Sequence, residues 1–196
     1  RVVADRNELI ERAASALTAG KIVGWCQGRM EFGPRALGNR SILANPTLPD
    51  MKDVLNARVK HREWFRPFAP AVLEEKVGDY FDPPFRSPYM LLVSNTRKDR
   101  VDLLPSVTHV DGTARLQTVS RDGNPLFYSL IERFGEKTGV PVVLNTSFNI
   151  RGEPIICDYG DALACFLNTD IDALALENCW VEKDSARQPI QPPADY

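Results

Sequence analysis

"NPLFYSLIERFGEKTGVPVVLN" (residues 124–145) predicts a helix that is followed at once by a buried strand. Asn124 is a favourable N-cap, Pro125 suits the first position of a helix, and Gly139 is a typical helix stop. Residues 140–145 form an almost continuous apolar run, which is typical of a strand covered on both faces. A helix and a buried strand in succession indicate an α/β fold.

The same alternation continues on both sides of this segment. Residues 5–20 predict a second helix, because Asp5 and Glu8 have the spacing of a capping box and a glycine ends the apolar periodicity. Further helices are predicted at 50–60, 74–81 and 161–169, and strands at 21–26, 40–45, 68–73, 88–95, 114–120 and 173–183. We expect an α/β domain over residues 1–184, with a mixed, twisted, largely buried sheet and flanking helices. The Pro-rich tail 185–196 is expected to be flexible.

The composition is that of an ordinary globular domain, with 43% apolar and 26% charged residues among 196. No apolar run reaches the about 18 residues of a membrane span, and the start of the chain lacks a secretory pattern. We therefore expect a cytoplasmic protein that does not contact membranes. The first residue is Arg rather than Met, so we expect an upstream segment that this chain does not contain.

The cysteines and histidines do not predict a metal centre. No C-x-x-C pair is present, and each cysteine has apolar neighbours, so we interpret all four as reduced core residues. They are Cys26, Cys157, Cys165 and Cys179. Only His61 and His109 accompany them, and no metal site is predicted in this chain.

The charge is unevenly distributed along the chain. The net charge is −2, yet residues 29–66 hold eight Lys/Arg against four Asp/Glu, a local charge of +4. A concentrated positive patch on an acidic body suits a small anionic ligand better than a long polyanion. Nucleic acid is therefore not the predicted partner.

Four segments interrupt the helix and strand patterns while they concentrate polar and basic side chains, as functional loops do. In chain order they are "GRMEFGPRALGNRS" (28–41), "KHREWFRPFAP" (60–70), "THVDGTARLQ" (108–117) and "LNTSFNIRGEP" (144–154). We call them the first to fourth loops and expect all four to lie at strand ends.

The first loop combines two glycines with two arginines. Gly33 and Gly38 permit turns and allow a ligand to approach the backbone. Arg35 and Arg40 carry planar forks of N–H donors that match phosphate or carboxylate oxygens. A surface loop with solvated charges is the alternative.

The second loop places three cations close together in sequence. Lys60, Arg62 and Arg66 repel one another in an empty site, so a bound anion would be favoured. A helix end with basic residues that complement the dipole would explain Lys60 and Arg62. It does not explain Arg66, because three aromatic residues are its neighbours in sequence, and an arginine held among aromatic rings is expected to be paired.

The third and fourth loops add polar groups of other kinds. Arg115 stands at the start of a strand, an ordered place from which to point into a cleft. His109 has three possible roles, as an acid or base, as a ligand contact or as a satisfied polar residue; lacking a nearby histidine or cysteine partner, we favour binding. The fourth loop offers Asn145, Thr146, Ser147 and Asn149, which could contact an amide or phosphate group or could form a turn that caps the strand.

None of the P-loop, G-x-G-x-x-G, H-E-x-x-H or G-x-S-x-G motifs is present, which argues against the common NTPase, dinucleotide, zinc-protease and hydrolase classes. The residues alone predict an α/β domain that binds a small phosphate-bearing ligand through several arginines.

The four loops, in this order, resemble the C-terminal domain of the O-carbamoyltransferases of nodulation-factor, cephamycin and aminoglycoside (tobramycin) pathways, over about residues 5–183. The resemblance implies a fold similar to that of threonylcarbamoyl-adenylate synthases. It also implies a sugar-kinase-like N-terminal domain, absent from this chain, that would be its partner and would hold the family's metal ion. The domain in hand would convert carbamoyl phosphate and ATP to carbamoyl-adenylate and pyrophosphate, and the other domain would pass the carbamoyl group to a hydroxyl.

The resemblance also implies roles for individual residues. The catalytic arginines would be Arg35, Arg66 and Arg115, and the carbamoyl phosphate contacts would be these three with Asn145 and Ser147. The nucleotide contacts would be Arg40, Lys60, Arg62 and Asn149. ATP is expected with Mg²⁺, for which Asp111 and Glu153 are candidate ligands.

Other functions remain open at this point. A threonylcarbamoyl-adenylate synthase-like enzyme would use bicarbonate and threonine instead of carbamoyl phosphate. An RNA-binding module is suggested by the basic region 29–66, and a docking domain without chemistry is the least specific alternative. A homodimer is possible.

Overall fold

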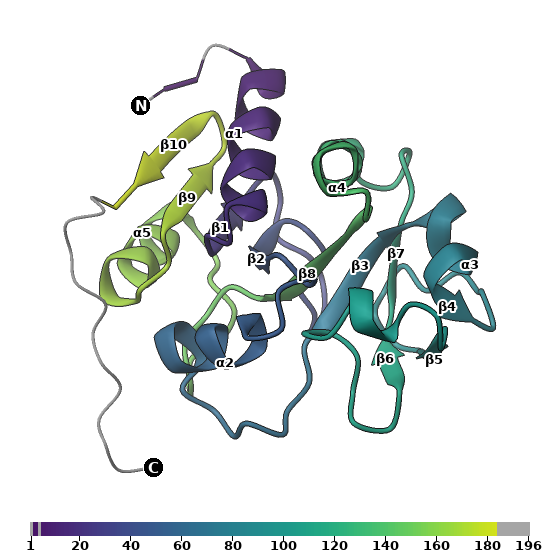
Figure 1. Cartoon of the computed structure of the whole chain (residues 1–196). Coiled ribbons are helices and arrows are strands. Elements are labelled where there is room, and N and C mark those ends of the chain that lie inside the picture. The colour runs from purple at the N-terminus through teal and green to yellow at the C-terminus, as the bar shows by residue number, and fades with distance from the viewer. Residues whose placement is uncertain (1, 4, 184–196) are drawn as a thin grey trace.

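A mixed sheet of seven strands forms the centre of the computed structural model, which describes residues 2, 3 and 5–183 (Figure 1). Its strand order is β10-β9-β1-β2-β8-β3-β7, and a second sheet has the order β4-β5-β6. The strands are β1 (Val23–Cys26), β2 (Arg40–Ala44), β3 (Ala69–Leu73), β4 (Phe81–Asp82), β5 (Val93–Thr96), β6 (Thr113–Arg115), β7 (Gln117–Val119), β8 (Val142–Ser147), β9 (Ala173–Leu176) and β10 (Cys179–Glu182). The helices are α1 (Arg6–Thr18), α2 (Met51–Leu55), α3 (Val77–Tyr80), α4 (Pro125–Thr138) and α5 (Tyr159–Asn168). The predicted class, a mixed α/β sheet with flanking helices, is confirmed.

The helix-to-strand segment folds as its sequence predicts. The Asn124 side chain accepts the backbone N–H of Phe127 at 3.1 Å, and Gly139 ends α4 with a φ of +77°. β8 follows, with its apolar part buried, and lies between β2 and β3 as an inner strand of the large sheet. α1 begins in the same way, because Asp5 accepts the backbone N–H of Glu8 at 2.8 Å.

Helices cover both faces of the large sheet, so two apolar layers form (Figure 1). α1 and α4 pack on one face, where Trp25, Leu43 and Val143 meet helix residues such as Leu17 and Phe134. α2 and α5 lie on the other face, against Ile42, Leu144 and Phe148. Alternate residues of one strand point to opposite layers, as a pleated strand requires.

Among the described residues, no helix has the length and apolar character of a membrane span.

Two predicted strands are each divided in the structure. The segment 114–120 separates at Leu116 into β6, which pairs with β5 in the small sheet, and β7, which pairs with β3 in the large one. The Leu116 N–H donates to Leu92 O, next to the β5–β6 pairing of the small sheet. The segment 173–183 forms the hairpin β9–β10, which turns at Glu177 with a φ of +49°. Alternating apolarity predicts an extended chain but does not report a change of partner strand.

Three further expectations need adjustment. The predicted helix at 50–60 is α2 followed by a π-helix (Asn56–Lys60). The strand predicted at 88–95 is β5, which begins only at Val93. Cys26 and Cys165 are buried, but Cys157 is exposed and Cys179 is half-buried, so the core prediction is wrong for these two. Apolar neighbours in sequence did not place Cys157 inside, because it lies just before the start of α5 at the surface. The tail 185–196 lies outside the described residues.

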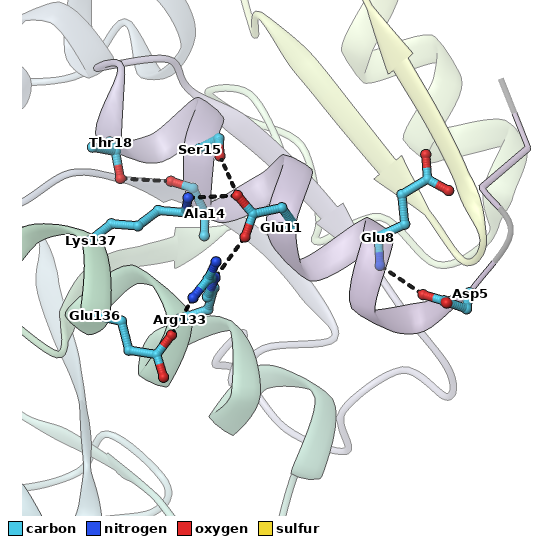
Figure 2. Close-up of polar contacts among 9 residues, drawn as sticks. All are labelled: Asp5, Glu8, Glu11, Ala14, Ser15, Thr18, Arg133, Glu136 and Lys137. Atoms are coloured by element: carbon cyan, nitrogen blue, oxygen red, sulfur yellow. Dashed lines mark hydrogen bonds and ion pairs between the residues drawn. The ribbon is translucent and has the colours of Figure 1, made fainter.

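Charged side chains join α1 to α4 at the surface of their shared layer (Figure 2). The Glu11 carboxylate accepts from Arg133 Nε and Lys137 Nζ, each at 2.6 Å, and from Ser15 Oγ at 3.1 Å. These contacts, that of Lys137 foremost, lower the pKa of Glu11 from its ordinary 4.5 to about 2. Arg133 also binds Glu136 within α4 at 2.5 Å.

Glu11→Gln should therefore lower the free energy of unfolding in a pH-dependent way. Because the pKa of Glu11 is lower in the folded state, its stabilisation is present above pH 4.5 and is lost as the pH falls towards about 2. Urea denaturation at neutral pH should separate the variant from the wild type, and the difference should vanish near pH 2. Glu136→Gln, which removes a contact within one helix, is the control; equal stability of Glu11→Gln and wild type at neutral pH would contradict this account.

Gly38 sets how closely the first loop approaches α4. Its φ is +108°, and an added Cβ would lie 2.3 Å from Cδ1 of the buried Phe127. Gly38→Ala should destabilise the protein by about 2–4 kcal/mol, from backbone strain and overpacking together. Gly33→Ala is the matched control, since its φ is +138° but no atom lies within 4 Å of the added carbon. Thermal unfolding measures both variants, and equal losses would show that the contact with Phe127 is unimportant.

Candidate functional site

The topology of the large sheet brings the four loops to one side, where β8 ends and β2, β3 and β7 begin. We call this side the sheet edge. β8 runs antiparallel to β2 and β3, so Ser147 lies opposite Ser41, and Asn145 lies opposite Ala69. The carboxyl end of β8 therefore adjoins the amino ends of β2 and β3, and β7 begins at the same edge because it is parallel to β3. The expectation that all four loops lie at strand ends is confirmed.

Asn145 connects three of these loops. Its side chain is 1% exposed, and its Nδ2 donates to Ala36 O at 3.2 Å and to Gln117 Oε1 at 2.7 Å. Gln117 Nε2 in turn donates to Leu37 O at 2.9 Å. Asn145 Oδ1 is buried and has no hydrogen-bond partner among the described residues. This amide is therefore fixed in orientation with one acceptor unused.

Arg35 and Arg115 form the centre of a positive cluster. Both side chains are half-buried, and the Nε of each is buried without a hydrogen-bond partner in the described part of the chain. Burial lowers the pKa of Arg115, and the charge of Arg35 lowers it further. The two guanidinium groups are thus close enough to repel each other. An anion between them would relieve that repulsion and supply the missing acceptors.

Arg62 extends the cluster towards the second loop. Burial lowers its pKa to about 10, and the charges of Arg66 and Arg115 act in the same direction. Its guanidinium lies 4.3 Å from the ring centroid of Phe68 and donates to Pro67 O at 3.2 Å. The positive charges of the first three loops therefore act on one another at this edge.

Arg66 is not enclosed as its neighbours in sequence predict. Its side chain is 59% exposed and lies 3.8 Å from the Glu63 carboxylate, a pair within the same exposed loop. Trp64 and Phe65 are exposed as well, and the buried Phe68 packs against Arg62 instead. Aromatic residues around an arginine in sequence do not enclose it when the segment projects from a sheet edge. Arg66 interacts with the cluster through its charge, which lowers the pKa of Arg62.

Arg40 is held by the backbone. It is buried at the start of β2 and donates to the carbonyl oxygens of Gln27, Gly28, Asn39 and Cys157 at 3.0–3.2 Å. Four of the five N–H donors of its guanidinium are used in this way. Arg40 therefore joins the chain after β1 to the chain before α5, and its predicted nucleotide contact stays a prediction.

Lys60 brings the second and fourth loops together. Its buried Nζ donates to Ser147 O at 2.5 Å, to Asn149 Oδ1 at 2.8 Å and to Asn149 O at 3.0 Å. Burial lowers the pKa of Lys60 to about 7, and the charge of Arg62 lowers it as well. Ser147 Oγ donates to Asn149 Oδ1 at 2.7 Å, so the three side chains form one group.

Glu31 is a structural determinant of the site that the sequence pattern did not single out. Its Oε1 accepts the backbone N–H groups of Leu37, Asn39 and Arg40 at 2.6, 2.8 and 3.3 Å. These contacts fold the first loop around the carboxylate and so place Arg35. The available signal was one acidic residue in an otherwise basic loop.

The candidate Mg²⁺ ligands are not assembled into a site by the chain itself. Asp111 Oδ1 accepts from the backbone N–H and the hydroxyl of Thr113 at 3.0 and 2.7 Å, and Glu153 is exposed. Within the described residues, no group of three His, Cys, Asp or Glu side chains could hold a metal ion. Asp111 and Glu153 stay candidate ligands of a Mg²⁺ ion.

Two cavities adjoin this edge of the sheet. One of about 140 Å³ is lined by Lys52, Phe65, Pro67 and residues 106–111, which include the start of the third loop. Another of about 470 Å³ lies among the first turns of α1 and α4 and the β9–β10 turn. Gly28 and Asn39 of the first loop line it, but none of the predicted site residues does. We place the candidate site at the arginine cluster, because the buried polar groups without a partner on Arg35, Arg115 and Asn145 lie there and none of these residues lines the larger cavity.

Known proteins share this domain. The family model described as carbamoyltransferase C-terminus matches residues 14–183. Nodulation protein NolNO of Sinorhizobium fredii is 49% identical, with 92% of this chain and 27% of the relative covered. The 3'-hydroxymethylcephem-O-carbamoyltransferase of Amycolatopsis lactamdurans is 40% identical over 88% of this chain and 33% of the relative. The chain thus spans about a third or less of these relatives.

The fold also occurs in a solved structure. Full-length HypF, crystallised in a phosphate- and nucleotide-bound form, aligns with a TM-score of 0.57 and 22% identity over 84% of this chain and 26% of HypF. At this identity the likeness concerns the fold alone. The family match, by contrast, covers most of the sequence and includes all four loops. The chain therefore belongs to the carbamoyltransferase C-terminus family.

Proposed function

We propose that this domain is the adenylate-forming part of an O-carbamoyltransferase, which binds carbamoyl phosphate and ATP. The observation that carries the proposal is the pair Arg35 and Arg115, two half-buried guanidinium groups with unpartnered Nε atoms at the sheet edge where the four loops meet. Family membership supports it, as does the O-carbamoyltransferase named among the relatives.

The cluster has the groups that carbamoyl phosphate requires. Arg35 and Arg115 offer charge-assisted donors to the phosphate, and Arg66 adds a third cation from the exposed second loop. Asn145 and Ser147 lie on neighbouring positions of β8 that face the same way, since they are two residues apart in a strand. They would contact the carbamoyl end of the substrate.

The nucleotide would occupy the side of the cluster formed by Lys60, Arg62 and Asn149. Lys60 and Asn149 are already hydrogen-bonded to each other, and burial of the Lys60 ammonium lowers its pKa to about 7. A triphosphate beside it would favour the charged form. Arg40 would act by holding the surrounding loops in place, with one N–H left to donate.

The proposed chemistry needs water as well as both substrates. Hydrolysis of carbamoyl phosphate gives inorganic phosphate and carbamate, and a carbamate oxygen then attacks the α-phosphorus of ATP. A C–O–P linkage forms, the bond to the β-phosphate breaks, and pyrophosphate leaves with its electron pair. Fixed arginines would cancel the repulsion between the two anions before the reaction, which is an electrostatic form of catalysis. The carbamoyl group would then pass to a hydroxyl in the rest of the polypeptide.

Exchange of labelled pyrophosphate into ATP tests the proposal. The exchange should require carbamoyl phosphate, and Arg115→Gln should lower its rate by about a hundredfold, because a donor to developing charge is lost. Arg97→Gln, at an exposed arginine paired with Asp99, is the control and should match the wild type. Exchange that depends on threonine and bicarbonate would instead favour a threonylcarbamoyl-adenylate synthase, and salt-sensitive RNA binding without exchange would favour an RNA-binding module.

Arg66→Ala should weaken carbamoyl phosphate binding less than Arg115→Gln does. Solvent competes with the ligand at an exposed guanidinium, so the expected loss of affinity is about threefold to tenfold. Titration calorimetry at low temperature measures the affinity of both variants for carbamoyl phosphate. A larger loss for Arg66→Ala than for Arg115→Gln would show that the second loop, and not the centre of the cluster, carries the binding energy.

A further inference from the structure

His109 lies next to the arginine cluster in a defined geometry. It begins the turn before β6, where its N–H donates to Thr113 O at 2.8 Å and its carbonyl accepts the Gly112 N–H at 2.9 Å. The imidazole Nδ1 lies 3.1 Å from Thr113 Oγ1. Thr113 and Arg115 are two residues apart in β6 and so share one face of the strand. The imidazole therefore rests on the face that carries Arg115.

The neighbours of this imidazole determine its tautomer. Thr113 Oγ1 lies 2.7 Å from Asp111 Oδ1, and the ionised carboxylate can only accept, so the single hydroxyl proton of Thr113 is donated to Asp111. Thr113 Oγ1 must then be the acceptor for His109 Nδ1, which carries the proton. Nε2 of the neutral ring is left as a bare acceptor.

This acceptor is unused in the structure. Nε2 is buried, and no hydrogen-bond partner for it exists among the described residues. Burial lowers the pKa of His109, and the charges of Arg115 and Lys52 act in the same direction, while Asp111 opposes them. The surrounding charges thus favour the neutral ring. A buried acceptor without a donor costs free energy that a suitable ligand would recover.

An unused acceptor beside the arginine cluster would select for a particular ligand. The arginines offer only donors, which suits phosphate oxygens, whereas His109 Nε2 calls for an N–H or O–H on the same ligand. A primary amide attached to a phosphate has both features. An acetyl phosphate, with a methyl group in place of the amino group, cannot satisfy Nε2.

We infer that His109 Nε2 accepts a hydrogen bond from the carbamoyl amino group and selects carbamoyl phosphate over other acyl phosphates. The inference rests on the proposed function and adds to it a specificity-determining residue. Among the described residues of the four loops, Glu31 Oε2 and Asn145 Oδ1 are also buried acceptors without a partner, and Asn145 could share the selection. A hydroxyl of the nucleotide ribose has the same donor chemistry, and binding measured without nucleotide separates the two sources.

The tautomer can be observed directly. Only two histidines occur in the chain, so ¹⁵N-imidazole spectra at neutral pH contain two ring systems, and His61→Asn identifies that of His109. The spectra should show a proton on Nδ1 and a pyridine-like Nε2 in the free protein. Nε2 should shift when an amide ligand binds. A proton on Nε2 in the free protein would overturn the inference.

The selection is tested with two stable phosphonates, carbamoylmethylphosphonate and acetonylphosphonate, which differ in NH₂ against CH₃. The wild type should bind the amide about tenfold more tightly, the value of one hydrogen bond to a buried group. His109→Asn keeps a polar group near Thr113 but has no atom at the position of Nε2. This variant should bind carbamoylmethylphosphonate more weakly and acetonylphosphonate as tightly as the wild type does, so the preference should disappear. His109→Gln restores an acceptor at that position and should recover part of the preference.

The outcomes separate this inference from the proposed function. If the wild type binds neither phosphonate nor carbamoyl phosphate, the proposed function fails and this inference fails with it. If the wild type binds both phosphonates equally, only the inference is overturned. An equal loss of affinity for both phosphonates in His109→Asn would show a structural role for His109, and an effect confined to ATP would assign Nε2 to the ribose; either result overturns the inference.

Discussion

The placement of β8 between β2 and β3, antiparallel to both, is the constraint on which the site depends. It brings the carboxyl end of one strand to the amino ends of its neighbours, so segments about a hundred residues apart in the chain supply one cluster of side chains. Asn145, on β8, then fixes the first loop through Ala36 and the third through Gln117. The backbone order of the sheet, more than any single contact, assembles the arginines.

A cluster of like charges is unfavourable in the empty protein, and the fold has to hold it. Glu31 draws three backbone N–H groups of the first loop onto one carboxylate oxygen, while Arg40 uses its own donors on four carbonyl groups. Neither residue has to touch a ligand to be essential for the geometry. The free energy stored in this way becomes available when an anion binds, which is the physical meaning of a preorganised site.

Most of the fold followed from the sequence because local signals and burial agree with each other. Asn124 and Gly139 bound α4 as expected, and the apolar run after them is an inner strand. The passage of the chain from the small sheet to the large sheet at Leu116 was not foreseeable. Residues on both sides of Leu116 have strand character, and only the strand with which they pair differs. In the site, the four loops were predictable from interrupted periodicity. The exposure of Arg66 and the backbone role of Arg40 were not, because both depend on where loops project from the sheet edge.

The division of one extended segment between two sheets has a mechanical consequence. Arg115 belongs to the small sheet and His109 to the turn that precedes β6, whereas Gln117 and Asn145 belong to the large sheet, and Leu116 is the joint between the two sheets. The spacing between the third-loop cation and the amide on β8 is therefore set by the angle at which the two sheets meet. A rotation about this joint would widen or narrow the site while every strand pairing of the large sheet stays intact.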